Sequence, residues 1–111
     1  ETIFMHPTIL FRYSAIGFVG HRIHYDYPYT KNEENYPDLI VHGPLQATFL
    51  LRAAEKLKGK SVTSFNHKVM APVFANSNYI IGAKENQDGS VSCWGAVEGT
   101  GMTMQAEAFF E

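Results

Sequence analysis

The chain has 111 residues, of which 45% are hydrophobic and 18% are charged. Single domains most often run to roughly 100–150 residues, so this length predicts one domain, residues 1–111, and excludes a second independent core. The apolar share excludes intrinsic disorder. Nine Lys and Arg against eleven Asp and Glu give a formal net charge of −2 without any basic block, which argues against nucleic acid as a partner.

Cys93 is the only cysteine, so the chain forms no internal disulfide and no cysteine-based metal site. The sequence lacks both a signal peptide and the roughly 20 apolar residues that a membrane span needs. We therefore expect a soluble cytoplasmic protein without membrane contact, or a protein of the mitochondrial matrix if the source is eukaryotic. Because the chain starts at Glu1 rather than Met, we also expect a processed product or a segment of a longer parent.

The amino-terminal third carries few regular patterns. Residues 8–11 predict a short strand, and residues 12–20 predict a helical turn or a bend. Residues 20–43 form a long irregular stretch with four tyrosines and two prolines. Long irregular segments inside compact domains are usually functional, so we expect the functional residues here.

A helix is predicted from Gly43 to about residue 58. Pro44 suits a first helical turn, and Gly59 is typical of a helix end. Apolar residues recur at helical spacing over most of the circumference, which predicts a central buried helix. These residues are Leu45, Phe49, Leu50, Ala53, Ala54 and Leu57.

Strands are predicted at residues 61–71, 79–85, 90–98 and 102–110. The Asp88-Gly89 pair is typical of a hairpin, and residues 99–101 provide a second turn. Alternate residues of the last strand predict a core face: Met102, Met104, Ala106, Ala108 and Phe110. We interpret Cys93 and Trp94 as packing residues. The predicted fold is α+β, with a long central helix wrapped by an antiparallel sheet of about five strands.

Two histidines, an arginine and a carboxylate lie within the seven residues from Gly20 to Asp26. Histidine suits proton transfer near neutral pH, and Asp26 could orient His24. The alternatives are ordinary surface histidines, or a metal site completed by His42 or His67. Two histidines and a carboxylate in one loop are a weak metal pattern, so we expect no metal.

Residues Val41, His42, Gly43 and Pro44 lead into the predicted helix. Free backbone N–H groups and the positive end of the helix dipole suit a developing oxyanion. Gly43 would let a ligand approach the backbone closely, although it could equally be a simple steric start to a buried helix.

Four tyrosines, at positions 25, 27, 29 and 36, surround the pair Glu33-Glu34. Aromatic rings stack on nucleic acid bases, but this stretch lacks the accompanying Lys and Arg that anchor phosphates. We therefore expect a folded loop that packs these rings on the sheet.

Three segments, "LFRYSAIGFVGHRIHYDYPYT", "YPDLIVHGPLQATFLL" and "APVF", resemble the MaoC-like dehydratases. Within that family, the resemblance is to the carboxy-terminal hot-dog half of the mesaconyl-CoA hydratase and acyl-thioester dehydratase group, over nearly the whole chain. It implies a hot-dog fold and a hydro-lyase that hydrates 2-enoyl thioesters, or dehydrates 3-hydroxyacyl thioesters, of coenzyme A or acyl carrier protein. The pantetheine arm belongs to the substrate, so no separate cofactor is expected. Because hot-dog units generally pair, we expect a homodimer or a higher homo-oligomer.

The family's active loop reads Asp-x-Asn-Pro-x-His, and His24 matches its final histidine. The resemblance makes His24 the acid–base residue and the Gly43 N–H the oxyanion donor. Val19 stands at the family's aspartate and cannot transfer a proton, so Asp26 and then His21 are the expected substitutes. The resemblance places the following residues around the substrate: Val19, Gly20, Arg22, Tyr25, Val41, His42 and Pro44.

Two other functions remain open for such a chain. A hot-dog thioesterase would share the fold and ligand but hydrolyse the thioester. A degenerate subunit would bind acyl thioesters, or complete a partner's tunnel, without turnover. Val19 favours the degenerate subunit, whereas the retained His24 opposes it.

Overall fold

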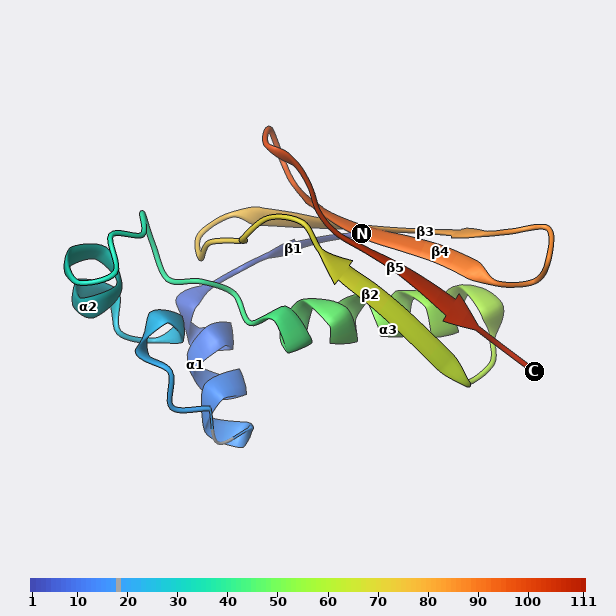
Figure 1. Ribbon diagram of the computed structural model, residues 1–111, viewed down its shortest axis with the longest axis horizontal. Helices are drawn as coiled ribbons and strands as arrows, with labels where there is room; N and C mark the ends of the chain where they lie inside the picture. The colour runs from blue at the N-terminus through green and yellow to red at the C-terminus, as the bar shows by residue number, and fades with distance from the viewer. Residues whose placement is uncertain (18) are drawn as a thin grey trace.

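One long helix lies against a five-stranded sheet in the computed structural model, which describes residues 1–17 and 19–111 (Figure 1). The strand order is β1-β3-β4-β5-β2, and all neighbours are antiparallel. This arrangement confirms the predicted α+β architecture. The elements are β1 (Thr2–Phe4), α1 (Pro7–Ile16), the 3₁₀ turn η1 (Arg22–His24), α2 (Tyr27–Asn32), α3 (Gly43–Lys58), β2 (Ser64–Val69), β3 (Asn78–Glu85), β4 (Val91–Val97) and β5 (Gly101–Phe109).

The central helix α3 has the predicted bounds. Pro44 occupies its first turn, where a missing N–H costs no helical hydrogen bond. Gly59 ends it in the left-handed conformation, with φ of 75°, and donates its N–H to Glu55. Leu50 and Ala54 are fully buried against the sheet. None of the helices within the described residues is long and apolar enough to cross a membrane.

The predicted core face of residues 102–110 is confirmed in its middle, while Phe110 lies just past β5 (Gly101–Phe109) and is partly buried against the core. Met104, Ala106 and Ala108 are buried, whereas Met102 is exposed. The ladder between β4 and β5 shifts register at Gly95/Ala96, so Thr103 becomes an extra residue and turns inward. A bulge of this kind changes the side on which the preceding side chains lie.

Gly95 lets the backbone of β4 approach a buried tyrosine. A Cβ atom at this position would lie 1.8 Å from the Tyr79 hydroxyl, which no real contact allows. Tyr79 is fully buried, and its hydroxyl donates to Gln46 Oε1 at 3.5 Å. Burial raises the pKa of Tyr79 to about 12. Glycine is therefore needed at position 95 for packing.

The strand predicted at residues 8–11 is wrong, because these residues belong to α1. His6 caps this helix by accepting the Thr8 N–H on Nδ1, and Pro7 starts it. The helical alternative for residues 12–20 is confirmed as far as Ile16, while Phe18 lies outside the described residues.

The stretch predicted to be irregular contains two short helices. Asp26 caps α2 by accepting the Tyr29 N–H, and η1 precedes it. Together with α1, these elements lie beyond the amino end of α3 (Figure 1). Residues 39–41 then pair with residues 73–75 through an isolated bridge between Ile40 and Phe74. The fold thus gathers the predicted functional segments at one end of the central helix.

Candidate active site

His24 is the last residue of η1, and a backbone carbonyl fixes its tautomer. Its Nδ1 lies 2.6 Å from the carbonyl oxygen of Ile40. Because a carbonyl only accepts hydrogen bonds, Nδ1 must carry the proton and donate it. In the neutral ring, Nε2 is then the unprotonated nitrogen. His24 is therefore set up to accept a proton at Nε2.

His24 and Gly43 line the same open pocket, whose volume is about 460 Å³. Gln46 is also there, one turn further along α3. The remaining wall is mainly apolar and comes from the residues before α3 and from the end of β2 and the chain after it. The other lining residues are Tyr36, Ile40, Val41, Val69, Met70, Ala71 and Pro72.

Gly43 begins α3, so its N–H has no acceptor within the helix. The first helical bond is the one from the Gln46 N–H to the His42 carbonyl, 3.1 Å long. A Cβ atom added at Gly43 would meet nothing within 4 Å, so the chain's own packing does not require glycine here. This open space favours the interpretation in which a ligand approaches the backbone.

His42 lies behind His24 and is only 2% exposed. Its Nε2 is 2.7 Å from the Ser14 hydroxyl, and its ring stacks on the His24 ring with centroids 3.8 Å apart and planes 18° apart. Burial, and secondarily the charge of His24, lower the pKa of His42 to about 4. His42 is thus a neutral buried ring near neutral pH. It does not line the pocket, although it was predicted to contact substrate.

The pKa of His24 lies below the ordinary histidine value of 6.5. Partial burial is the main cause, and the hydrogen bond to Ile40 opposes it, while the charge of His21 lowers the pKa further. The ring of His21 stands edge-on to His24, with centroids 5.8 Å apart. His21 is exposed, and it is the predicted proton-transfer partner that the structure brings beside His24.

Asp26 is not brought to His24, because both of its carboxylate oxygens are engaged elsewhere. Oδ2 accepts two hydrogen bonds from Arg22 at 3.0 and 2.9 Å, and Oδ1 accepts the Tyr29 N–H. The hydrogen bond from Arg22 is the main reason why the pKa of Asp26 is lowered. Its side chain therefore acts as a helix cap and ion-pair partner, and it stays ionised.

The other predicted residues surround the loop at different depths. Arg22 is exposed, and its guanidinium lies 3.9 Å from the centroid of the Tyr29 ring. The Tyr25 hydroxyl donates to the Gly20 carbonyl at 3.1 Å, which closes the loop on itself. Val41 lines the pocket, whereas Pro44 is exposed on the first turn of α3.

Val19 is partly buried, and its N–H donates to the Ser14 carbonyl. Its side chain brings no proton-transfer group to the loop.

The prediction that the tyrosine rings pack on the sheet is wrong. Tyr25, Tyr27 and Tyr36 are exposed, and the Tyr29 ring lies against the Arg22 guanidinium. These rings belong to the loop and the short helix α2, which lie beyond the amino end of α3 and away from the strands (Figure 1).

Sequence reasoning missed Ser14 and Gln46. Gln46 is 2% exposed, and its amide makes two long hydrogen bonds, to the Val41 carbonyl at 3.4 Å and from the Tyr79 hydroxyl at 3.5 Å. A glutamine within an otherwise apolar helical face was the available signal. Ser14 gave none, because residues 12–20 showed no clear helical period.

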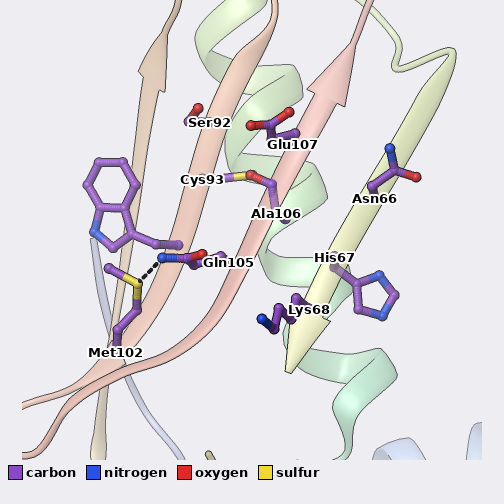
Figure 2. Close-up of a pocket in the computed structure, with 10 residues that line it drawn as sticks. Asn66, His67, Lys68, Ser92, Cys93, Met102, Gln105, Ala106 and Glu107 are labelled. Carbon is purple, nitrogen blue, oxygen red and sulfur yellow. Dashed lines mark hydrogen bonds between the residues drawn. The ribbon is translucent and has the colours of Figure 1, made fainter. Parts of the chain in front are cut away.

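A second hollow, of about 440 Å³, lies on the face of the sheet that is turned away from α3 (Figure 2). Its lining includes His67 and Lys68 of β2 and Trp94 of β4. His67 lines this hollow and not the pocket that holds His24. Within the part of the chain that the structure describes, no group of three or more His, Cys, Asp or Glu side chains could hold a metal ion.

Solved structures place this architecture in a known class. The chain superposes on the (R)-hydratase from A. caviae with a TM-score of 0.84 at 16% identity, covering 97% of this chain and 88% of that one. A MaoC-like dehydratase gives 0.82 at 18% identity, over 100% of this chain and 38% of the other. At these identities the likeness shows the fold, so the chain is a hot-dog domain.

Sequence comparison narrows this class to one family. The model of the hydroxyacyl-thioester dehydratase type 2 family matches residues 1–75, so the chain belongs to that family. Mesaconyl-C(4)-CoA hydratase of Chloroflexus aurantiacus is 41% identical over 88 residues, which are 79% of this chain. The mitochondrial hydroxyacyl-thioester dehydratase type 2 of Schizosaccharomyces pombe is 37% identical over 73 residues, or 63% of this chain. The chain spans only 31% and 24% of these two relatives.

Proposed function

We propose that this chain carries a hydro-lyase site that adds water to 2-enoyl thioesters, or removes it from 3-hydroxyacyl thioesters. The observation that carries the proposal is the pairing of His24 and Gly43 in one pocket, with the His24 tautomer set by Ile40. The names of the relatives, a hydratase and a hydroxyacyl-thioester dehydratase, support the same reaction class.

His24 acts as the general base in hydration. Its Nε2 takes a proton from water while the water oxygen bonds to the β-carbon of the enoyl thioester. The proton on Nδ1 stays there and is donated in a hydrogen bond to the Ile40 carbonyl oxygen, which stabilises the imidazolium that forms. Because the pKa of His24 is lowered, most molecules carry a neutral His24 ring at neutral pH, and a neutral ring can act as a base.

Gly43 stabilises the enolate. When water adds, negative charge moves onto the thioester oxygen, and an N–H at the amino end of α3 provides both a donor and a favourable dipole. The missing Cβ leaves the backbone open to the substrate. A carbonyl oxygen bound there would lie in the same pocket as His24.

The proton that completes hydration must reach the α-carbon. His24 can return the proton that it took, or the neighbouring His21 can deliver one, since its ring lies beside His24. Asp26 is less suited to this role, because its carboxylate is engaged with Arg22 and Tyr29. We therefore assign the return of the proton to the histidine pair.

A second hot-dog unit would complete the site. β2 is an edge strand with mostly exposed residues, and Val69 and Met70 at its end are exposed while lining the pocket. An open edge with free backbone groups favours pairing with another strand. We propose that a second copy, or a second hot-dog unit, lies along β2 and covers the pantetheine arm of a coenzyme A or acyl carrier protein thioester.

The test follows the loss of the enoyl thioester when crotonyl-CoA or mesaconyl-CoA is mixed with the protein. His24→Ala should lower kcat about 10²–10⁴-fold, and light scattering after size-exclusion chromatography should show a pair. Release of free coenzyme A thiol would instead identify a thioesterase. Binding by titration calorimetry without turnover would identify a subunit that only binds the thioester.

A further inference from the structure

A buried hydrogen bond links α1 to the active loop. The hydroxyl of Ser14 lies 2.7 Å from Nε2 of His42, and the two residues are 5% and 2% exposed. The Ser14 carbonyl also accepts the Val19 N–H at 2.8 Å, at the start of the loop that leads to His24. Ser14 therefore holds the loop at one point and the His42 ring at another.

The His42 ring is held between two other rings. The Tyr13 ring is tilted against the His42 ring, with centroids 4.6 Å apart and planes 58° apart. The His24 ring stacks on the His42 ring, with centroids 3.8 Å apart and planes 18° apart. Its Nδ1 is buried and makes no hydrogen bond to the described residues. Among the described residues, Ser14 is the one that hydrogen-bonds the His42 ring. A buried nitrogen without a hydrogen bond is energetically unfavourable, so packing alone does not explain an imidazole at position 42.

The hydrogen bond to Ile40 does not by itself fix the His24 ring. A single bond at Nδ1 sets the distance of that atom but leaves the ring free to tilt about the bond. A flat ring stacked on its face removes that freedom. Because Nε2 lies across the ring from the Nδ1 anchor, a small tilt of the ring would move Nε2 away from the reacting atoms.

We propose that Ser14 and His42 are positioning residues for His24: Ser14 holds the His42 ring, and that ring holds the His24 ring so that Nε2 stays aimed into the pocket. The inference deepens the proposed hydro-lyase function and rests on it for its catalytic meaning. The titratable groups that face His24 are His21 from its own loop, His42 from the amino end of α3 and Tyr36 across the pocket.

The experiment uses the full chain with Ser14→Ala, and Ser92→Ala on β4 as the matched control. Alanine suits a helix interior, so the variant is expected to fold. The His24 pKa and ring chemical shifts are measured by NMR titration, and kcat and KM with crotonyl-CoA. Ser14→Ala should shift the His24 ring signals, raise its pKa toward 6.5 as water reaches the ring, and lower kcat about tenfold with KM nearly unchanged. Ser14→Thr, which keeps the hydroxyl, should recover most of the lost kcat.

Unchanged His24 shifts, pKa and kcat in Ser14→Ala would overturn the positioning role. If Ser14→Ala does not fold, Ser14→Cys keeps the side-chain volume but weakens the bond, and the same two readouts decide. The NMR measurement needs no turnover. A wild-type protein inactive on every thioester would therefore refute the proposed function, while the His24 shifts would still decide whether Ser14 and His42 hold the ring.

Discussion

The oxyanion role of Gly43 can be isolated by replacing it with proline. Proline has no N–H to donate, and it is favoured at the first position of a helix. The preceding residue, His42, has φ of −59° and ψ of 135°, which is the extended conformation that a following proline requires. Gly43→Pro should therefore preserve the start of α3 while removing the donor.

The expected loss is large enough to measure easily. Removal of one oxyanion donor typically lowers kcat about 10²–10³-fold, or about 2.7–4 kcal/mol in the barrier. Gly43→Ala is the matched control, because it keeps the N–H and its Cβ meets no protein atom within 4 Å. Any loss in Gly43→Ala measures obstruction of the substrate by a Cβ atom. The ratio of the two variants then measures the replacement of the N–H hydrogen by the proline Cδ.

The assay compares initial rates of crotonyl-CoA hydration at saturating substrate for the wild type and both variants. Thermal melts of the three proteins check that the fold is retained. A Gly43→Pro variant with a kcat within about threefold of Gly43→Ala would refute the assignment, because a functioning oxyanion donor contributes far more.

Four further outcomes are expected. His24→Ala should lower kcat about 10²–10⁴-fold, and wild-type kcat/KM should fall on the acid side of a pKa below 6.5, because only the neutral ring accepts a proton; a pH-rate profile checks both. Asp26→Asn, which still caps a helix, should keep kcat within about threefold, whereas a catalytic acid would lose far more, so steady-state kinetics discriminate. Because the pKa of His42 is about 4 when folded and 6.5 when exposed, the unfolded state binds its proton first as pH falls. Urea unfolding at pH 7 and pH 4.5 should therefore show a loss of up to about 3 kcal/mol, and His42→Phe should lose less. Gly95→Ala should destabilise the fold by about 1–3 kcal/mol through its clash with the Tyr79 hydroxyl, and Tyr79→Phe should relieve part of the cost; urea unfolding of the single and double variants tests this.

Periodicity predicted the helix and the meander because their patterns are local. The apolar spacing from Leu45 to Leu57 and the Asp88-Gly89 turn depend on neighbouring residues alone. Residues 8–11 were predicted as a strand, but a segment of four residues is too short to show a helical period. The cap at His6 and the proline at position 7 favour the helix that forms. A cap depends on one hydrogen bond and a bulge on one extra residue, and a hydrophobic pattern shows neither.

The site was predictable where a motif lay within one segment. His24 and Gly43 came from two such motifs, and the structure places both in one pocket. Two contacts were not predictable. The first is the hydrogen bonding of Asp26 to Arg22, because a carboxylate in this loop can serve either as a helix cap or as a proton-transfer partner. The second is the contact of Ser14 with His42. Ser14 and His42 are 28 positions apart in the sequence, and the packing of α1 brings them together.

The isolated bridge between Ile40 and Phe74 bears on how the protein loses activity. Residues 39–41 are joined to residues 73–75 by two backbone bonds, one 2.7 Å and one 2.8 Å long, apart from the main sheet. Such a small unit opens at a lower free energy than a five-stranded sheet does. Because the Ile40 carbonyl sets the tautomer of His24, opening this bridge would release the histidine while the sheet stayed folded. Inactivation would then precede unfolding in denaturant, and the amide of Val41 would exchange its hydrogen faster than those of β3 and β4.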